Sequence, residues 1–154
     1  MANLPAVNGK LTKLSVSADG TTFTEICIFG DLTIDFGNQA LNKEWCIGSE
    51  TPYVSLGNNE FADLTYVTPW AEDATTAVGV GIIETAKESK TIAGSTIHVQ
   101  VEMNNATDPA KKGTLYDYEA VIGGYKILAA SEGVVKSEFT MAQSTIPVNT
   151  TAEV

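Results

Sequence analysis

A strict alternation of apolar and polar side chains is the feature that most constrains how this chain can fold. Within Thr96–Met103, every second residue is apolar: Ile97, Val99, Val101 and Met103. The residues between them are polar: His98, Gln100 and Glu102. Successive side chains of a β-strand point to opposite faces of the sheet, so this pattern predicts a strand with one face in a core.

Similar patterns predict strands along most of the chain. Leu14 and Val16 belong to a first strand that ends at the Asp19-Gly20 turn. The further candidates are 22–29, 32–36, 61–67, 115–122, 125–130 and 134–141. Strands joined by short polar turns are typical of an antiparallel β-sandwich or barrel. We therefore expect a mainly β fold in a single domain of 154 residues.

One segment, 71–89, interrupts the strands and predicts a flanking α-helix. It begins with acidic residues and ends near lysines, as the helix dipole favours. Gly79 and Gly81 each disfavour a helix by about 1 kcal/mol relative to alanine. A strand over 78–83 is therefore the alternative, and we favour a single helix.

Three further segments lack a regular pattern. The composition of residues 37–59 predicts a long irregular loop between strands. The ends, 1–9 and 146–154, are polar segments with scattered apolar residues; they would be disordered in solvent, or arms if docked on a neighbour. Loops longer than about 12–15 residues are uncommon in compact domains and are usually functional. Large apolar residues are frequent in this loop: Leu41, Trp45, Ile47, Tyr53 and Leu56. Exposed on a monomer, they would favour aggregation unless a partner covered them.

The composition leaves few residues for catalysis or metal binding. The chain has one histidine, His98, and two cysteines, Cys27 and Cys46, which we expect to be separate reduced thiols, with Cys27 buried in an apolar run. Asp117 and Glu119 share one strand face, but no apolar site is indicated around them. We expect no catalytic site, no metal site and no cofactor.

The charge is strongly negative. Nineteen acidic residues against nine lysines, with no arginine, give a net charge of −10. This balance argues against sequence-specific DNA binding, which depends largely on arginine. No apolar run reaches the roughly 18 residues of a membrane-spanning helix, and the first ten residues lack a secretory pattern. We therefore expect no membrane partner and synthesis in a cytoplasm.

The order of these elements resembles that of the major tail tube proteins of long-tailed bacteriophages, within the phage tail tube and type VI secretion tube superfamily. The likeness covers nearly the whole chain and rests on order and pattern. It includes the strand at 61–67, the helix at 71–89, the strand at Thr96–Met103, a hairpin beginning at Gly113 and a last strand ending in Ile146-Pro147-Val148.

The resemblance implies a structural virion protein without enzymatic activity. Hexameric rings would stack into a tail tube, assembled in the host cytoplasm, through which double-stranded DNA passes without specific binding. The other implied partners are the tail tip or baseplate, tape-measure and tail terminator proteins. Residues 37–59 would then be the inter-ring loop, with contacts expected from Leu41, Trp45, Ile47, Tyr53 and Leu56. We expect four residues to face the lumen: Gln100, Glu102, Asp117 and Glu119.

An acidic lumen would repel DNA phosphates, so that the duplex slides instead of binding. An alternative explanation of the negative charge is that it only keeps the protein soluble.

Two other functions remain open. A type VI secretion tube protein would share the fold and the ring. A monomeric carbohydrate- or ligand-binding β-sandwich would use Trp45, Tyr53 and Trp70 as contact aromatics instead of interface anchors.

Overall fold

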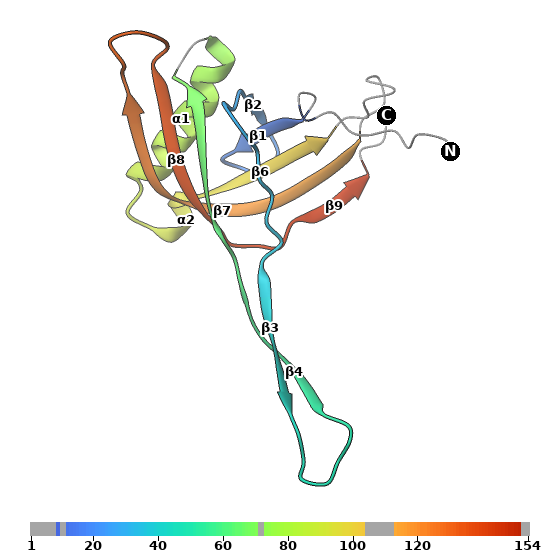
Figure 1. Cartoon of the computed structure of the whole chain (residues 1–154). Coiled ribbons are helices and arrows are strands. Elements are labelled where there is room, and N and C mark those ends of the chain that lie inside the picture. The colour runs from blue at the N-terminus through green and yellow to red at the C-terminus, as the bar shows by residue number, and fades with distance from the viewer. Residues whose placement is uncertain (1–8, 10–11, 71–72, 104–112, 152–154) are drawn as a thin grey trace.

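The computed structural model describes residues 9, 12–70, 73–103 and 113–151. It shows a curled antiparallel sheet, a helix against one of its faces, and a long hairpin that projects away from this body (Figure 1). The mainly β, antiparallel fold class expected from the sequence is confirmed. Neither helix within the described ranges has the length and apolar character needed to cross a lipid bilayer.

The main sheet has seven strands in the order β2-β1-β6-β7-β8-β5, with β9 also pairing with β7. The strands are β1 (Lys13–Ser17), β2 (Thr24–Ile26), β5 (Asp63–Pro69), β6 (Thr96–Met103), β7 (Thr114–Leu128), β8 (Lys136–Gln143) and β9 (Val148–Thr151). A single bridge joins Phe29, just after β2, to Val67 on the free edge of β5. The sheet therefore curls toward closure, and within the described residues this is the one isolated β-bridge between its two outer edges.

The core lies on the inner face of this curled sheet. Ile97, Val99 and Val101 are at most 1% exposed, so the alternation in β6 predicted its buried face correctly. They pack with apolar residues of the other strands, including Leu14, Val16, Tyr118, Phe139 and Met141. Removing these side chains from water is the main stabilising contribution to such a fold.

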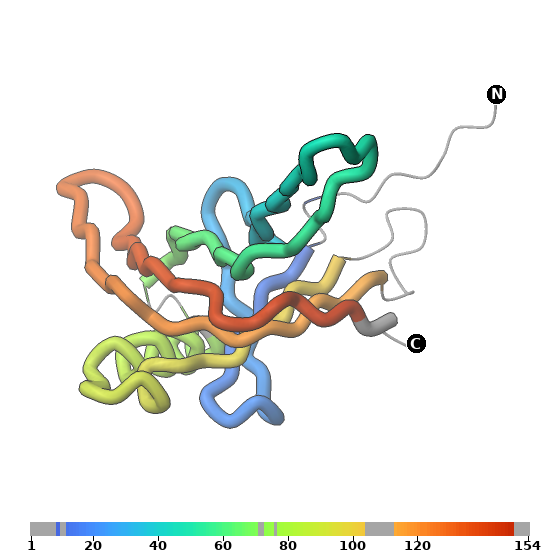
Figure 2. The backbone as a smooth tube through the Cα atoms, turned by 90° about the horizontal axis from the view of Figure 1, so that it is seen from below, coloured from blue at the N-terminus to red at the C-terminus, as the bar shows by residue number. Residues whose placement is uncertain are grey.

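Two helices lie together along one side of the sheet: α1 (Ala74–Glu88) and the short α2 (Ile92–Ser95) (Figure 2). The helix predicted at 71–89 is thus present, and the alternative strand is not. Gly79 lets α1 approach β2 closely, because a Cβ atom there would lie 2.9 Å from Cγ1 of Ile26. The second helix was not predicted from the sequence.

Several strand predictions need correction. Residues 32–36 form no strand; two of them, Leu32 and Ile34, pack against the core as an irregular segment. The separate strands expected at 115–122 and 125–130 are one strand, β7, with a register shift between Ile122 and Gly124. The two glycines between the expected strands, Gly123 and Gly124, lie at this β-bulge, so the strand continues through them.

The expected irregular loop at 37–59 is instead a regular hairpin of β3 (Asn38–Glu44) and β4 (Tyr53–Glu60). As expected, this segment lies in the chain between two strands of the main sheet, β2 and β5. Its own two strands form a second sheet with no further member among the described strands. At its base, the Phe36 ring packs edge-on against Tyr116 of β7, with 5.4 Å between centroids, which anchors the hairpin to the body.

The two predicted arms lie mostly outside the described residues or within the sheet. Of 1–9, only Gly9 is described. Of 146–154, Val148–Thr151 forms β9 and pairs antiparallel with β7 of the same chain, while 152–154 lie outside the described residues.

Candidate assembly surfaces

The projecting hairpin exposes six large apolar side chains. All five residues expected as inter-ring contacts lie on it, and all are exposed: Leu41, Trp45, Ile47, Tyr53 and Leu56. Ile47, in the turn between the strands, is fully exposed at 107%, and Tyr53 is 70% exposed. Side chains of this size are normally buried, so the hairpin is a surface suited to a partner.

The register divides these residues between two faces of the hairpin. Leu41 lies opposite Leu56, and Lys43 lies opposite Val54, so one face carries three apolar side chains and a lysine. Tyr53 lies opposite Glu44 on the other face. An isolated two-stranded hairpin is marginally stable in water. Because the hairpin buries neither face against its own body, it gains little stability from its own chain.

The four residues expected to line a lumen also lie together, on the face of the main sheet opposite the core. Gln100 pairs in register with Asp117, and its Nε2 atom donates a hydrogen bond to the Asp117 Oδ2 atom at 3.2 Å. Glu102 and Glu119 share this face by strand alternation, and all four side chains are half-buried. The four side chains therefore lie on one surface of the sheet.

Carboxylates dominate the charge of this polar face. Two of its lysines have carboxylate neighbours: Lys13 Nζ lies 3.8 Å from Glu25, and Lys126 Nζ lies 2.9 Å from Glu138. His98 Nδ1 lies 3.5 Å from the Glu119 Oε1 atom. A third lysine, Lys136, lies over the Phe29 ring, 5.4 Å from its centroid. Pairs this exposed contribute little to stability, but they offset the cations that form them. The remaining carboxylates, among them Glu102 and Asp117, leave the face negative.

The segment that follows β8 holds Glu119 in place. The Glu119 N–H donates to the Thr145 hydroxyl at 2.8 Å, and the Ser144 N–H donates to the Glu119 carbonyl at 2.9 Å. Beside this segment, His98, Glu119, Ile146 and Val148 line an open groove of about 400 Å³. The backbone at the edge of the polar face is thus fixed where β9 begins.

Among the described residues, no three His, Cys, Asp or Glu side chains are placed to hold a metal ion. Burial raises the pKa of Tyr66 and, more strongly, of Tyr118, so both phenols stay neutral at ordinary pH. The Tyr66 hydroxyl donates to the Thr33 carbonyl, which gives it a structural role.

Sequence reasoning missed one concave surface. A groove of about 700 Å³ lies beside β1, β2 and the segment 27–32. Cys27 is exposed on it, which corrects the expectation that this thiol is buried; Cys46 is also exposed, and both are free, as expected. The alternation across Ile26-Cys27-Ile28 could have indicated that Cys27 points away from its buried neighbour.

No protein-family model and no curated protein sequence matches the chain. Solved structures do match. A chain of the anti-feeding prophage cap (AFP tube terminating cap) is 10% identical with a TM-score of 0.69, over 99% of this chain and 95% of that one. A chain of an extracellular contractile injection system, the PVC sheath–tube complex in its extended state, is 10% identical with a TM-score of 0.61, over 96% and 93%.

A chain from the tail of an empty GTA particle with C6 symmetry is 17% identical with a TM-score of 0.60, over 94% of this chain and 99% of that one. These likenesses span almost the whole chain at low identity. The protein therefore has the fold found in components of contractile injection systems and of a tail particle.

Proposed function

We propose that this chain is a structural subunit that joins copies of itself into hexameric rings, and that these rings stack into the tail tube of a virion. The observation that carries the proposal is the exposed apolar hairpin on a body with the fold of tail and injection-system components. Such a surface needs a partner, and a second copy is always available at the site of synthesis.

The polar face supports the second part of the proposal, a conduit for double-stranded DNA. A wall that binds DNA releases counterions through free cationic contacts. Here the lysines Lys13 and Lys126 each have a carboxylate neighbour, and further carboxylates lie between them on the sheet. A lumen lined by this face would repel phosphates and let the duplex slide. In this proposal the chain has no enzymatic role, is located in the tail after assembly in the host cytoplasm, and contacts tail tip or baseplate, tape-measure and terminator proteins.

A tube of a secretion or contractile injection system is the second candidate, favoured by the likeness to chains of an anti-feeding prophage and of a PVC sheath–tube complex. The same ring and the same hairpin contact would serve it. Only the material that passes through the lumen would differ. Protein cargo co-purifying with the tubes in place of DNA would favour this candidate.

The test replaces residues 41–56 by Asn-Gly. Ala40 and Gly57 face each other closely across the hairpin, since a Cβ on Gly57 would lie 3.2 Å from that of Ala40, so a two-residue turn can join them. We expect the variant to keep the circular dichroism of the native body and to form no tubes in electron micrographs. Tubes built by this variant would contradict the proposal. So would a native protein that stays monomeric at every concentration and binds a glycan.

A further inference from the structure

We propose that the base of the projecting hairpin is a rigid connection, and that Gly37 is the residue that fixes the direction in which the hairpin leaves the body. The hairpin base comprises residues 35–37, where the chain enters the hairpin, and 59–61, where it leaves. This inference rests on the proposed function. It adds a positioning residue, which acts through the direction of the hairpin and not through a side chain of its own.

Gly37 has a backbone conformation that other residues rarely adopt. Its φ is +78°, in the left-handed region that favours glycine. The Gly37 N–H donates to the Asp35 Oδ1 atom at 2.7 Å, which closes a short turn around Phe36. The chain therefore changes direction at one defined point, immediately before β3 begins at Asn38.

The other side of the hairpin base fills the space beside Gly37. A Cβ atom at this position would lie 2.6 Å from the Asn59 Oδ1 atom and 2.9 Å from the Glu60 carbonyl oxygen, both too close for a real contact. It would also lie 3.1 Å from the Phe61 ring. The Glu60 oxygen belongs to the backbone and cannot rotate away as a side chain can. A larger residue at position 37 would therefore push the two strands apart where the hairpin joins the body.

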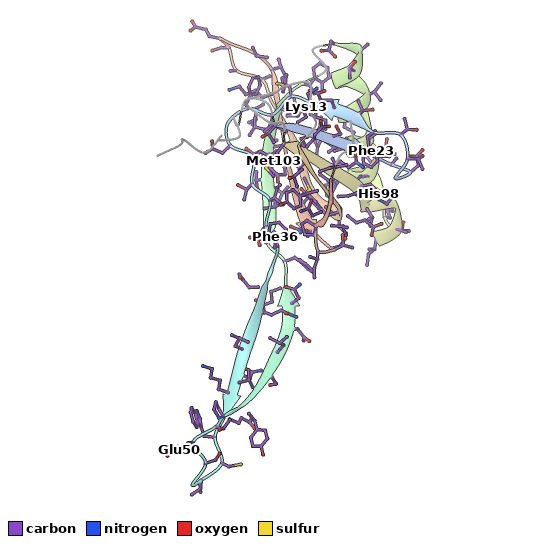
Figure 3. All side chains as sticks on the ribbon, turned by 90° about the vertical axis from the view of Figure 1, so that its right-hand side faces the viewer. Lys13, Phe23, Phe36, Glu50, His98 and Met103 are labelled. Atoms are coloured by element: carbon purple, nitrogen blue, oxygen red, sulfur yellow. The ribbon has the colours of Figure 1, made fainter. Side chains whose placement is uncertain are left out.

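The body holds both ends of the hairpin. On the entering side, the Phe36 ring packs against Tyr116 with 5.4 Å between centroids and 80° between the ring planes. The Thr33 carbonyl accepts a hydrogen bond from the buried Tyr66. On the leaving side, Ala62 packs against the core, and β5 begins at the next residue. Figure 3 shows Phe36 at the junction of the hairpin and the body. A hairpin held through both strands and a ring contact cannot swing about a single bond.

Three other glycines of the described chain have a positive φ but open space where a Cβ atom would lie: Gly30, Gly48 and Gly133. These positions favour glycine for the backbone alone, whereas Gly37 is required by both backbone and packing. Gly48, with a φ of +81°, lies in the turn of the same hairpin. A comparison of Gly37 with Gly48 therefore separates the packing at the base from the cost of the backbone conformation.

A fixed direction would make assembly less costly. A flexible segment loses conformational freedom when it binds, and a segment that is already ordered avoids this loss. Leu41 and Leu56 are each 64% exposed on the hairpin. A hairpin free to swing could fold back and cover such side chains against its own body. A rigid base keeps them available to a second copy.

Distances between two spin labels in the free subunit test the rigidity directly. One label is placed on Cys27 in the body and the other on Asn42→Cys in β3, in a Cys46→Ser background; both labelled positions are exposed. The control pair, in the same background, joins Cys27 to Ala142→Cys, an exposed position of β8. We expect double electron–electron resonance to give a distance distribution as narrow for the hairpin pair as for the body pair.

Gly37→Ala should shift or broaden the distribution of the hairpin pair and leave that of the body pair unchanged, whereas Gly48→Ala should change neither. Phe36→Ala is the second variant, for use should Gly37→Ala not fold, because it removes a half-exposed ring and should broaden the same distribution. In sedimentation assays of the unlabelled protein, Gly37→Ala should raise the concentration at which tubes form by about tenfold or more. Gly133→Ala, in the turn between β7 and β8, should leave this concentration unchanged.

Three results would overturn the inference. The first is a native hairpin distribution much broader than that of the body pair. The second is a folded Gly37→Ala subunit with the native hairpin distribution, and the third is a folded Gly37→Ala subunit that forms tubes at the native concentration. Each of these leaves the proposed function standing. A native subunit with a narrow distribution that never assembles would instead remove the proposed function, and with it the role of Gly37 in assembly.

Discussion

Replacing Ile47 by serine separates the contribution of the hairpin to assembly from its contribution to folding. Ile47 is fully exposed, so the substitution removes no buried area and should change the free energy of unfolding by less than about 0.5 kcal/mol. Burial of an isoleucine side chain at an interface contributes about 1.5–3 kcal/mol. Since each 1.4 kcal/mol is a factor of ten, the concentration at which tubes form should rise about 10- to 100-fold.

The assay pairs sedimentation of tubes over a concentration series with urea unfolding of the free subunit. Ile92→Ser is the matched control, because Ile92 is also largely exposed, at 80%, but lies on α2 away from the hairpin. It should leave the assembly threshold unchanged. If Ile47→Ser and Ile92→Ser shift the threshold equally, or if Ile47→Ser destabilises the subunit by more than about 1 kcal/mol, the reasoning fails.

Three further predictions concern the helix, the polar face and a turn. Gly81→Ala faces open space and should stabilise the protein by up to about 1 kcal/mol in urea unfolding, whereas Gly79→Ala should destabilise it, since its Cβ would lie 2.9 Å from a β2 side chain. Glu102→Lys should make tubes retain duplex DNA in a salt-dependent manner in pelleting assays, and Glu88→Lys on α1 should not. Backbone N–H groups that donate to Asp19 hold the pKa of that carboxyl well below its usual range. Its stabilising effect is therefore present above the ordinary pKa and is lost as the pH falls through the lowered one; an NMR titration of Asp19 should find its pKa below the ordinary value for an aspartate.

The parts of the fold that were predicted correctly are those where local pattern and burial agree. In β6, Ile97, Val99 and Val101 enter the core at every second position, so alternation alone identified the strand and its buried face. The helix near 71–89 was predictable from its charges despite two glycines. Its Gly79 is explained only by tertiary structure, because close packing against β2 requires a residue without a Cβ atom.

The hairpin shows why the candidate site was only partly predictable. Its strands have both faces exposed, so the polarity of a residue does not indicate which way its side chain points. Leu41 and Leu56 meet across the strands despite a register shift after Gln39, which the sequence does not signal. The apolar residues themselves were identifiable, because residues of that size without a core pattern are unusual.

The pairing of β9 with β7 could not be predicted from the sequence for a different reason. Pairing of β9 with the first half of β7 joins residues more than thirty positions apart, such as Asp117 and Val148. No local pattern specifies such a contact. The bulge after Ile122 has the same character, since it lets β7 continue past a glycine pair that usually ends a strand.

Folding and assembly depend on different residues of this chain. Phe139 and Val99 are fully buried and hold the body together, whereas the hairpin exposes its apolar side chains. A subunit can therefore be stable before it assembles, but free subunits would then risk sticking at random through their hairpins. A net charge of −10 opposes such encounters over distances of about 10 Å at 0.1 M salt. Only a contact that buries the apolar side chains of the hairpin gains enough apolar area to overcome this repulsion, so in the proposed assembly the net charge would also favour ordered growth.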